Sequence, residues 1–162
     1  MRRKLKKVVT SVMTLALLSG SVLTMSSNVS ANTTDRNIKF DVPVWSWDNP
    51  TKPYGKDTSS SVYLYIKTGD NSVKVRTYGC TRNNASSFNW NKNLTLNKKG
   101  EDADSVTCAI GKEYQIYNKV KETGYGYAGL KMQTKGYSSN TVKGVWSPDF
   151  TKVKGHKYTI AN

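Results

Sequence analysis

The segment from Ser61 to Cys80 (SVYLYIKTGDNSVKVRTYGC) constrains the fold most strongly, because apolar and polar side chains alternate on both sides of a short turn. Such alternation is typical of β-strands that bury one face and expose the other. We therefore expect two strands, one on each side of the turn, whose apolar faces join a hydrophobic core. These apolar faces comprise Val62, Leu64, Ile66, Val73 and Val75.

A turn at Asp70 and Asn71 predicts that the two strands form an antiparallel hairpin, since Asp and Asn tolerate the positive φ angles of tight hairpin turns. This register keeps both apolar sets on one face of one sheet, which is the condition that fixes strand pairing. On the other face Tyr65 lies opposite Arg76, and this arrangement permits a cation–π contact.

That second face combines aromatic and cationic side chains, and we predict that it faces solvent and forms a binding surface. The lysines at positions 67 and 74 face each other in this register, and a bound anion would relieve their repulsion. The predicted binding residues are Tyr63, Tyr65, Lys67, Lys74, Arg76 and Tyr78. The alternative is that the segment containing Trp45 and Trp47 covers this face, which would then be structural.

The rest of the chain contains further short alternating segments that are separated by turn residues. We expect strands within Ile38–Trp47, Ser87–Leu96, Ser105–Ile110, Tyr127–Thr134, Val142–Trp146 and Tyr158–Ala161. Residues 48–61 predict a loop, and the spacing in residues 113–123 fits either a strand or a helix. Together these elements predict an all-β fold, a single-domain antiparallel β-sandwich or small barrel with at most one short helix.

The first 31 residues predict a secretory signal peptide. They begin with a cationic segment, MRRKLKK, continue with a mostly apolar run from Val8 to Leu18, and end in Val29-Ser30-Ala31, which suits a signal peptidase. An uncleaved membrane anchor is the alternative, but anchors usually need about 18 or more apolar residues. Cleavage after Ala31 would leave residues 32–162 as one secreted, extracellular domain without a transmembrane segment.

The chain is basic, with a formal net charge of +14. Five cationic residues belong to the predicted signal peptide, so the processed chain keeps 14 − 5 = +9. Such a charge favours polyanionic partners. Outside the cell we expect an anionic cell-wall polymer or a glycan rather than nucleic acid. The lysines are scattered along the chain, which also fits a role in solubility alone.

Cys80 and Cys108 are the two cysteines of the chain. In an exported protein such a pair predicts a disulfide, and two free thiols are the alternative. We expect no metal site, because two cysteines and His156 do not complete a tetrahedral zinc set. A cluster of acidic residues in a predicted loop leaves calcium binding or simple solvation open: Glu101, Asp102 and Asp104.

Two C-terminal segments, GKEYQIYNKVKETGYGYAGLKM and VKGVWSPDF, resemble the corresponding part of a family of small exported proteins of Gram-positive bacteria that has no assigned function. The most specific pieces are the Gly-Tyr run before Leu130 and the motif Gly144-x-Trp146-Ser147-Pro148-Asp149. The resemblance covers about the last third of the processed chain. It implies an extracellular single-domain protein and supplies no catalytic residue.

The sequence contains no Gly-x-Ser-x-Gly or His-Glu-x-x-His motif. We therefore expect no enzymatic activity and no cofactor. The chain is rich in aromatic residues, with four Trp, ten Tyr and three Phe, and their rings suit sugar-stacking or protein-binding surfaces. The leading hypothesis is a secreted non-enzymatic binding protein that acts at a bacterial cell envelope. The alternatives are a secreted bacteriocin- or toxin-like antimicrobial protein and an exported enzyme or inhibitor.

Overall fold

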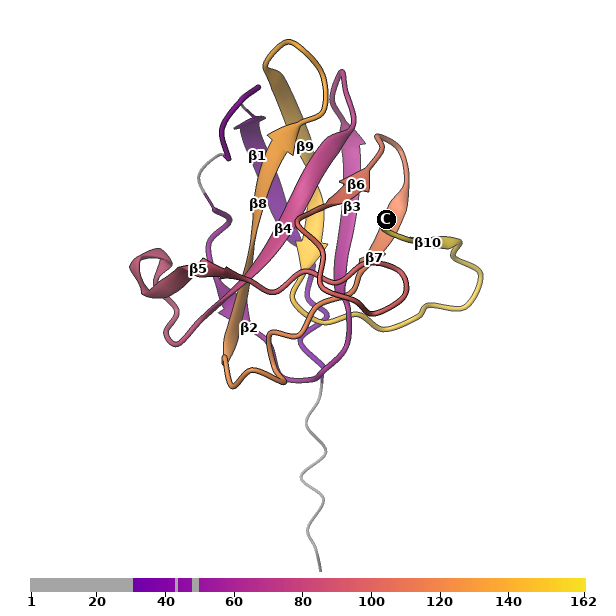
Figure 1. Cartoon of the computed structure of the whole chain (residues 1–162). Coiled ribbons are helices and arrows are strands. Elements are labelled where there is room, and N and C mark those ends of the chain that lie inside the picture. The colour runs from indigo at the N-terminus through magenta and orange to yellow at the C-terminus, as the bar shows by residue number, and fades with distance from the viewer. Residues whose placement is uncertain (1–30, 43, 48–49) are drawn as a thin grey trace, which may run out of the picture.

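The structure, a computed structural model, describes residues 31–42, 44–47 and 50–162. The predicted signal peptide lies outside the described residues except for Ala31. Two β-sheets form the described part of the chain (Figure 1). No helix in these ranges is long and apolar enough to cross a membrane.

Sheet A contains five strands, and sheet B contains five. In spatial order, sheet A consists of β1 (Arg36–Val42), β9 (Asn140–Ser147), β3 (Val62–Thr68), β7 (Glu113–Ile116) and β10 (Tyr158–Ile160). Sheet B consists of β2 (Tyr54–Gly55), β8 (Tyr127–Thr134), β4 (Val73–Cys80) and β5 (Phe88–Asn93), with β6 (Val106–Cys108) also paired to β4. A single turn of 3₁₀ helix, η1 (Ala85–Ser87), precedes β5.

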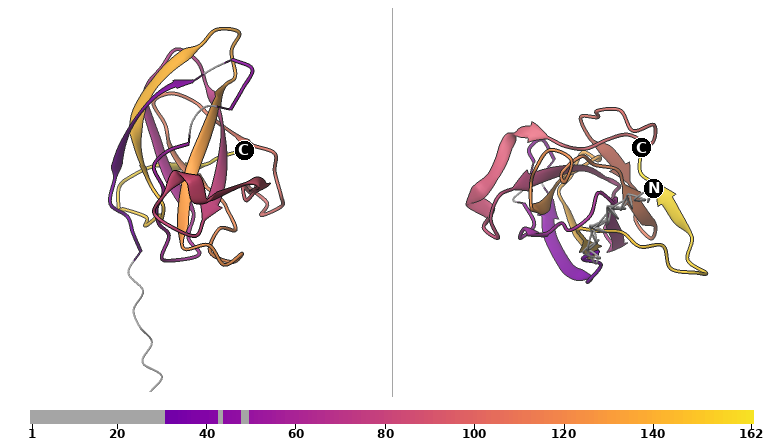
Figure 2. Two further views of the ribbon diagram at one scale, coloured as in Figure 1. Left: turned by 90° about the vertical axis from the view of Figure 1, so that its left-hand side faces the viewer. Right: turned by 90° about the horizontal axis from the view of Figure 1, so that it is seen from below.

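The two sheets pack face to face as a β-sandwich, which confirms the predicted fold class (Figure 2). All strand pairs are antiparallel except β7 and β10, which are parallel. The strand predicted within Ile38–Trp47 is present as β1, which lies at the edge of sheet A and pairs only with β9. Sequence reasoning missed β2, a two-residue strand inside the predicted loop.

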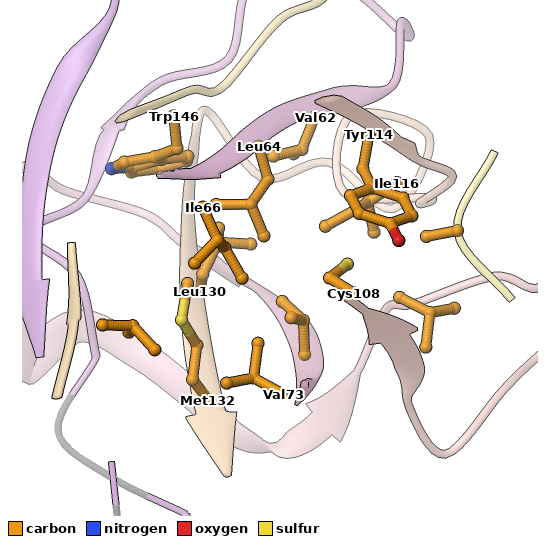
Figure 3. Packing of buried hydrophobic residues seen from close by; sticks show 14 of the residues in the cluster. Val62, Leu64, Ile66, Val73, Cys108, Tyr114, Ile116, Leu130, Met132 and Trp146 are labelled. Atoms are coloured by element: carbon orange, nitrogen blue, oxygen red, sulfur yellow. The ribbon is translucent and has the colours of Figure 1, made fainter. Parts of the chain in front are cut away.

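Side chains from both sheets point into one shared core (Figure 3). The apolar residues that alternation predicted to be buried are all fully buried: Val62, Leu64, Ile66, Val73 and Val75. Each such aliphatic side chain contributes about 1.5–3 kcal/mol when it is fully removed from water. The same core contains Leu130 and Met132 of β8, in the sheet opposite β3, and Trp146 of β9, in the sheet opposite β4.

The predicted hairpin is wrong, because β3 and β4 belong to different sheets. β3 pairs with β7 and β9, whereas β4 pairs with β5, β6 and β8. Their connection is therefore an arch that crosses from one sheet to the other. The two apolar faces look at each other across the core instead of lying side by side, and this arrangement satisfies the same alternation.

The side chain of Asn140, from the start of β9, holds this arch. Its Oδ1 accepts a hydrogen bond from the backbone N–H of Asp70 at 2.8 Å, and its Nδ2 donates to the carbonyl oxygen of Asn71 at 2.7 Å. Asn140 is only 1% exposed. A buried side-chain amide from a distant strand thus satisfies two backbone groups of the arch.

The segment that fitted either a strand or a helix is a strand followed by a turn. Residues 113–116 form β7, and a turn follows at residues 120–124. Gly124, at its end, has φ of +87°, a conformation that side-chain-bearing residues rarely adopt.

The predicted disulfide is wrong as well, because both cysteines, which lie in the described part of the chain, are free and buried. Cys108 pairs with Val73 at the start of β4, whereas Cys80 ends that strand. Seven residues of strand separate these positions by roughly 23 Å, and a disulfide needs Cα atoms within about 7 Å. Burial raises the pKa of both thiols.

A buried ion pair joins the two sheets at one end of the sandwich. Lys56 follows β2 of sheet B, Asp149 follows β9 of sheet A, and both side chains are 0% exposed. The Lys56 ammonium lies 3.0 Å from Asp149 Oδ1 and donates to the carbonyl oxygens of Ser60 at 2.6 Å and Pro148 at 2.8 Å. All three donors of this buried cation therefore have acceptors.

Asp149 accepts further hydrogen bonds from the residues around Lys56. Donors include the backbone N–H of Asp57 at 2.9 Å and the hydroxyls of Thr58 at 2.8 Å and Ser60 at 3.1 Å. Burial tends to raise the pKa of this carboxyl, but hydrogen bonds from backbone N–H groups and the Lys56 ammonium outweigh it and hold the pKa below its ordinary value. The motif ending in Asp149 thus has a structural role.

Candidate functional site

The structure divides the six predicted binding residues between the two sheets. Tyr63, Tyr65 and Lys67 lie on the outer face of sheet A, since the intervening residues of β3 point into the core. Lys74 and Arg76 lie on the outer side of β4, in sheet B. The predicted pairs between the two halves, including the contact of Tyr65 with Arg76, do not form.

On sheet B, two of the three predicted binding residues, Arg76 and Tyr78, contact other parts of the protein. The guanidinium of Arg76 lies 4.0 Å from the ring centre of Trp47 and forms an ion pair with Asp104. Tyr78 is 5% exposed and belongs to a small cluster with Cys80 and Phe88. The alternative interpretation, in which the Trp45–Trp47 segment covers this face, is therefore correct at Arg76.

On sheet A, the β3 tyrosines lie in the middle of the sheet's outer face. Tyr63 pairs with Ser147 of β9 and Gln115 of β7, and Tyr65 pairs with Val145 and Glu113 of the same strands. β10 extends this face beyond β7, with Tyr158 opposite Glu113. Figure 1 shows β10 and the loop before it at the side of the molecule, next to β7.

A pocket of about 290 Å³ opens on this face, and we call it the aromatic pocket. Its lining comprises Thr33, Asp35, Tyr63, Ser147, Phe150, Thr151, Val153, His156 and Tyr158. The rings of Phe150 and Tyr158 meet edge to face with centres 4.8 Å apart, and Tyr63 lies 6.2 Å from Tyr158. Such contacts fix the rings in place.

A second, more open hollow of about 550 Å³ adjoins the pocket, and we call it the lysine groove. It is lined by Tyr65, Gly111, Lys112, Glu113, Gly155, His156, Lys157 and Thr159. His156 lines both hollows, and its Nδ1 lies 3.3 Å from each carboxylate oxygen of Glu113. The ring of His156 also stacks on Tyr158 with a centre-to-centre distance of 5.9 Å.

The surroundings of the aromatic pocket raise the pKa values of two side chains, Tyr63 and Asp35. Burial and the nearby carboxylates of Glu113 and Asp35 raise the pKa of Tyr63 well above its usual range, so its phenol stays protonated. Burial also raises the pKa of Asp35, although Lys67 opposes the shift. The phenol of Tyr63 therefore lies beside two carboxylates and hydrogen-bonds to that of Glu113.

Exposed lysines continue this surface toward the other end of sheet A. Lys39 of β1 pairs directly with Lys143 of β9, and Lys143 pairs with Thr68, the neighbour of Lys67. All three lysines are exposed. Like charges that face each other across a strand pair are unfavourable, so an anion bound there would be stabilising. The predicted facing pair of Lys67 and Lys74 is wrong, because β3 and β4 lie in different sheets, and the lysines that do face each other are those of β1 and β9.

Sequence reasoning did not assign Glu113, Phe150, His156 or Tyr158 to a site. They lie far from Tyr63 along the chain, and the parallel pairing of β10 with β7 brings Tyr158 and the loop before it onto this face. The only signal in the sequence was the short closing strand, which placed Tyr158 on a sheet without indicating its neighbours.

The acidic loop residues do not come together. Asp102 forms an ion pair with Lys119, and Asp104 forms one with Arg76. Glu101 accepts a hydrogen bond from Asn97 at 3.0 Å. Within the described ranges, no three His, Cys, Asp or Glu side chains form a group that could hold a metal ion.

Fold and site together define a single β-sandwich with an aromatic pocket and an adjoining lysine groove on one outer face. The chain belongs to the DUF2712 family, a family of proteins of unknown function, whose model matches residues 25–150. The match includes Tyr63 and Phe150 and ends before His156 and Tyr158. No curated protein and no solved structure matches the chain.

Proposed function

We propose that this protein is a secreted, non-enzymatic binding protein of the Gram-positive cell envelope, and that it binds an anionic glycopolymer of the wall on the outer face of sheet A. One observation carries the proposal: the aromatic pocket and the lysine groove adjoin each other and share His156. Rings and cations are thus adjacent, as a polymer of sugars and anionic groups requires.

The pocket suits a sugar ring. Aromatic side chains provide flat apolar surfaces, and ligand sites typically combine such surfaces with a few polar groups that fix orientation. Here the rings come from Tyr63, Phe150 and Tyr158. The carboxylate of Asp35 adds an acceptor for sugar hydroxyl groups, and the phenol of Tyr63, which donates to Glu113, offers its oxygen as a second acceptor.

The groove suits the anionic groups of the polymer. Lys112 and Lys157 line it, and an ammonium group binds phosphate or carboxylate as a compact charge. The net charge of +9 expected after processing would also attract a polyanion over distance. The predicted signal peptide and the resemblance to exported Gram-positive proteins support a location at the wall.

Binding of the processed protein to purified cell walls, with and without their anionic polymers, tests the proposal. The double variant Lys112→Gln/Lys157→Gln should bind less tightly, by about twofold to thirtyfold for two exposed charge contacts, and with a weaker dependence on salt. The matched control Lys74→Gln/Lys131→Gln removes two charges from sheet B and should bind like the native protein. Equal affinities for the two double variants would contradict the proposal.

A second candidate function is an exported glycoside hydrolase. The observation that favours it is the presence of two interacting carboxylates, Asp35 and Glu113, next to His156 on one face. Glycosidases commonly use two carboxyl groups. Incubation of walls with the native protein and with Glu113→Gln separates the candidates, because only a hydrolase would release soluble sugar and lose this activity in the variant.

A further inference from the structure

The backbone nitrogen of Asn32 contacts the buried ion pair that joins the sheets. It lies 2.8 Å from Oδ2 of Asp149, whereas Lys56 lies 3.0 Å from Oδ1. The Asn32 side chain donates to the carbonyl oxygen of Gly55 at 2.9 Å, and the Asn32 carbonyl accepts from the N–H of Asp149 at 3.3 Å. Three polar contacts in the same small region therefore position Asn32 near the start of the described chain.

Asn32 is also the residue that directly follows the predicted cleavage point after Ala31. We propose that removal of the signal peptide turns the Asn32 amide nitrogen into an α-ammonium group that forms an ion pair with Asp149, so that processing completes the junction between the two sheets. This inference rests on the export that the proposed function includes, but not on its ligand.

The chemical change is a hydrolysis by the host's signal peptidase. The C–N bond between Ala31 and Asn32 breaks, the oxygen of one water molecule joins the Ala31 carbonyl carbon, and the products at neutral pH are a carboxylate on Ala31 and an ammonium on Asn32. The ammonium gains two N–H donors relative to the amide. The hydrogen bond from Thr33 N–H to the Ala31 carbonyl, 3.0 Å long, is lost.

The charges around Asp149 suit this change. Its two oxygens have separate donors, so the new cation does not compete with Lys56 for the same atom. A second carboxylate is close, because Asp57 Oδ1 and Asn32 Nδ2 both lie 3.7 Å from the position of a Cβ on Gly55. Two charged residues farther out act on Lys56 in opposite directions. The carboxylate of Glu122 tends to raise the pKa of Lys56, and the ammonium of Lys121 tends to lower it.

The interaction should be stronger after processing than before it. A hydrogen bond between an ammonium and a carboxylate is roughly twice as strong as one between neutral groups, and the Asp149 side chain is fully buried, where water screens the pair least. The uncleaved chain has only a neutral amide at this position. Processing thereby adds stability at the end of the sandwich where β2 and β9 meet.

The test uses chains exported and processed by a Gram-positive host and recovered from the medium. One is native, and one carries two glycines between Ala31 and Asn32, so that its new amino group lies beyond the junction. Sequencing of the native N-terminus should begin at Asn32. Acetylation of the native amino group at pH 7, below both pKa values, should be roughly tenfold slower than that of the extended chain, which corresponds to a rise of about one unit in pKa.

Urea unfolding of the same two chains gives an independent measurement. The native chain should unfold at higher urea at pH 7, because an amino group whose pKa is raised on folding stabilises the protein below its unfolded pKa, about 7.7–8.0. The difference should disappear as the pH rises through the raised value. In chains that also carry Asp149→Asn, the native and extended N-termini should be acetylated at the same rate and the two chains should be equally stable in urea. If Asp149→Asn prevents folding, the acetylation rates of the native and extended chains with Asp149 intact test the ion pair.

Equal acetylation rates in the native and extended chains would overturn the inference, as would a native N-terminus other than Asn32. Binding of the two chains to cell walls is measured in parallel. Normal binding with equal acetylation rates would refute only the ion pair, whereas loss of binding in both chains with slow native acetylation would refute only the proposed function.

Discussion

The outer faces of the two sheets carry similar aromatic and cationic residues in different surroundings. On sheet A, Tyr63 and Tyr65 border hollows that are open to solvent. On sheet B, Arg76 packs on Trp47 and Tyr78 is buried in a small cluster. Both halves come from the same alternating segment of sequence. The difference shows that an aromatic and cationic stripe stays open to solvent only where the rest of the chain leaves it uncovered.

The largest expected effect comes from breaking the ion pair that holds the two sheets together. Asp149→Asn leaves the Lys56 ammonium buried without a charged partner, and loss of one partner of a buried pair typically costs about 3–5 kcal/mol. We expect urea unfolding to show a loss of this size at pH 7. The exposed carboxylate of Asp70, at the arch, provides the control Asp70→Asn, which should change stability by less than about 0.5 kcal/mol.

The same variant should also change the response to acid. The pKa of Asp149 in the folded protein lies below its ordinary value of 3.8, so its stabilising effect is present above about pH 4 and is lost as the pH falls through the lowered pKa. The native protein should therefore lose stability more steeply in acid than Asp149→Asn. Parallel acid unfolding curves for the two proteins would contradict this assignment.

A smaller effect, confined to sheet A, should follow from Gly144→Ala. A Cβ at this position would lie 2.1 Å from the backbone oxygen of Tyr65, so β9 and β3 must move apart. Overpacking of this kind typically costs about 1–3 kcal/mol, and wall binding should fall with it because β3 carries the pocket tyrosines. Gly126→Ala is the matched control, since a Cβ there meets nothing within 4 Å. Equal stability of the two variants would argue against this β3–β9 register.

Arg76→Gln tests whether the outer face of sheet B has a structural role and no role in binding. It removes the contact with Trp47 and the ion pair with Asp104, which are partly exposed and together contribute about 0.5–1 kcal/mol. We expect a small loss of stability, a change in tryptophan fluorescence and unchanged wall binding. If the variant binds walls less well but is as stable as the native protein, Arg76 contributes to binding and its structural assignment is wrong.

The smallest expected effect concerns the cysteines. Because Cys80 and Cys108 lie at opposite ends of β4, the intact mass should equal that of the reduced chain, and a reducing agent should leave the melting temperature unchanged. Both thiols are buried, so alkylation should be slow in the native protein and complete after unfolding. A mass lower by two hydrogen atoms would contradict the observed strand positions.

Sequence alternation predicted the fold class and the buried residues of β3 and β4, but not which strands pair. A hairpin and an arch bury the same residues, such as Val62 and Val73, and differ only in whether the two apolar sets share a sheet. The groups that favour the arch are distant: Asn140 satisfies the backbone of Asp70 and Asn71 from about 70 residues away in the chain. Local turn chemistry alone therefore suggested the wrong connection.

The candidate site was predicted in part, since Tyr63 and Tyr65 border its hollows and Lys67 lies on the same face. The remaining contributors come from the C-terminal segment, and only the parallel pairing of β10 with β7 places His156 and Tyr158 next to them. Nothing local in the sequence specifies a pairing between a four-residue strand and a three-residue strand that are more than forty residues apart.

The difference between the two outer faces can be measured directly by amide chemical-shift mapping of the processed protein titrated with soluble fragments of anionic wall polymer. We expect shifts to concentrate on β3, β7 and β10 and on the loop before β10, with Tyr63, Tyr65, Glu113 and Tyr158 among the affected residues. Residues on the outer side of β4 and β8, including Lys74, should stay unchanged. Shifts centred on sheet B, or no shifts at saturating polymer, would contradict a binding surface on sheet A.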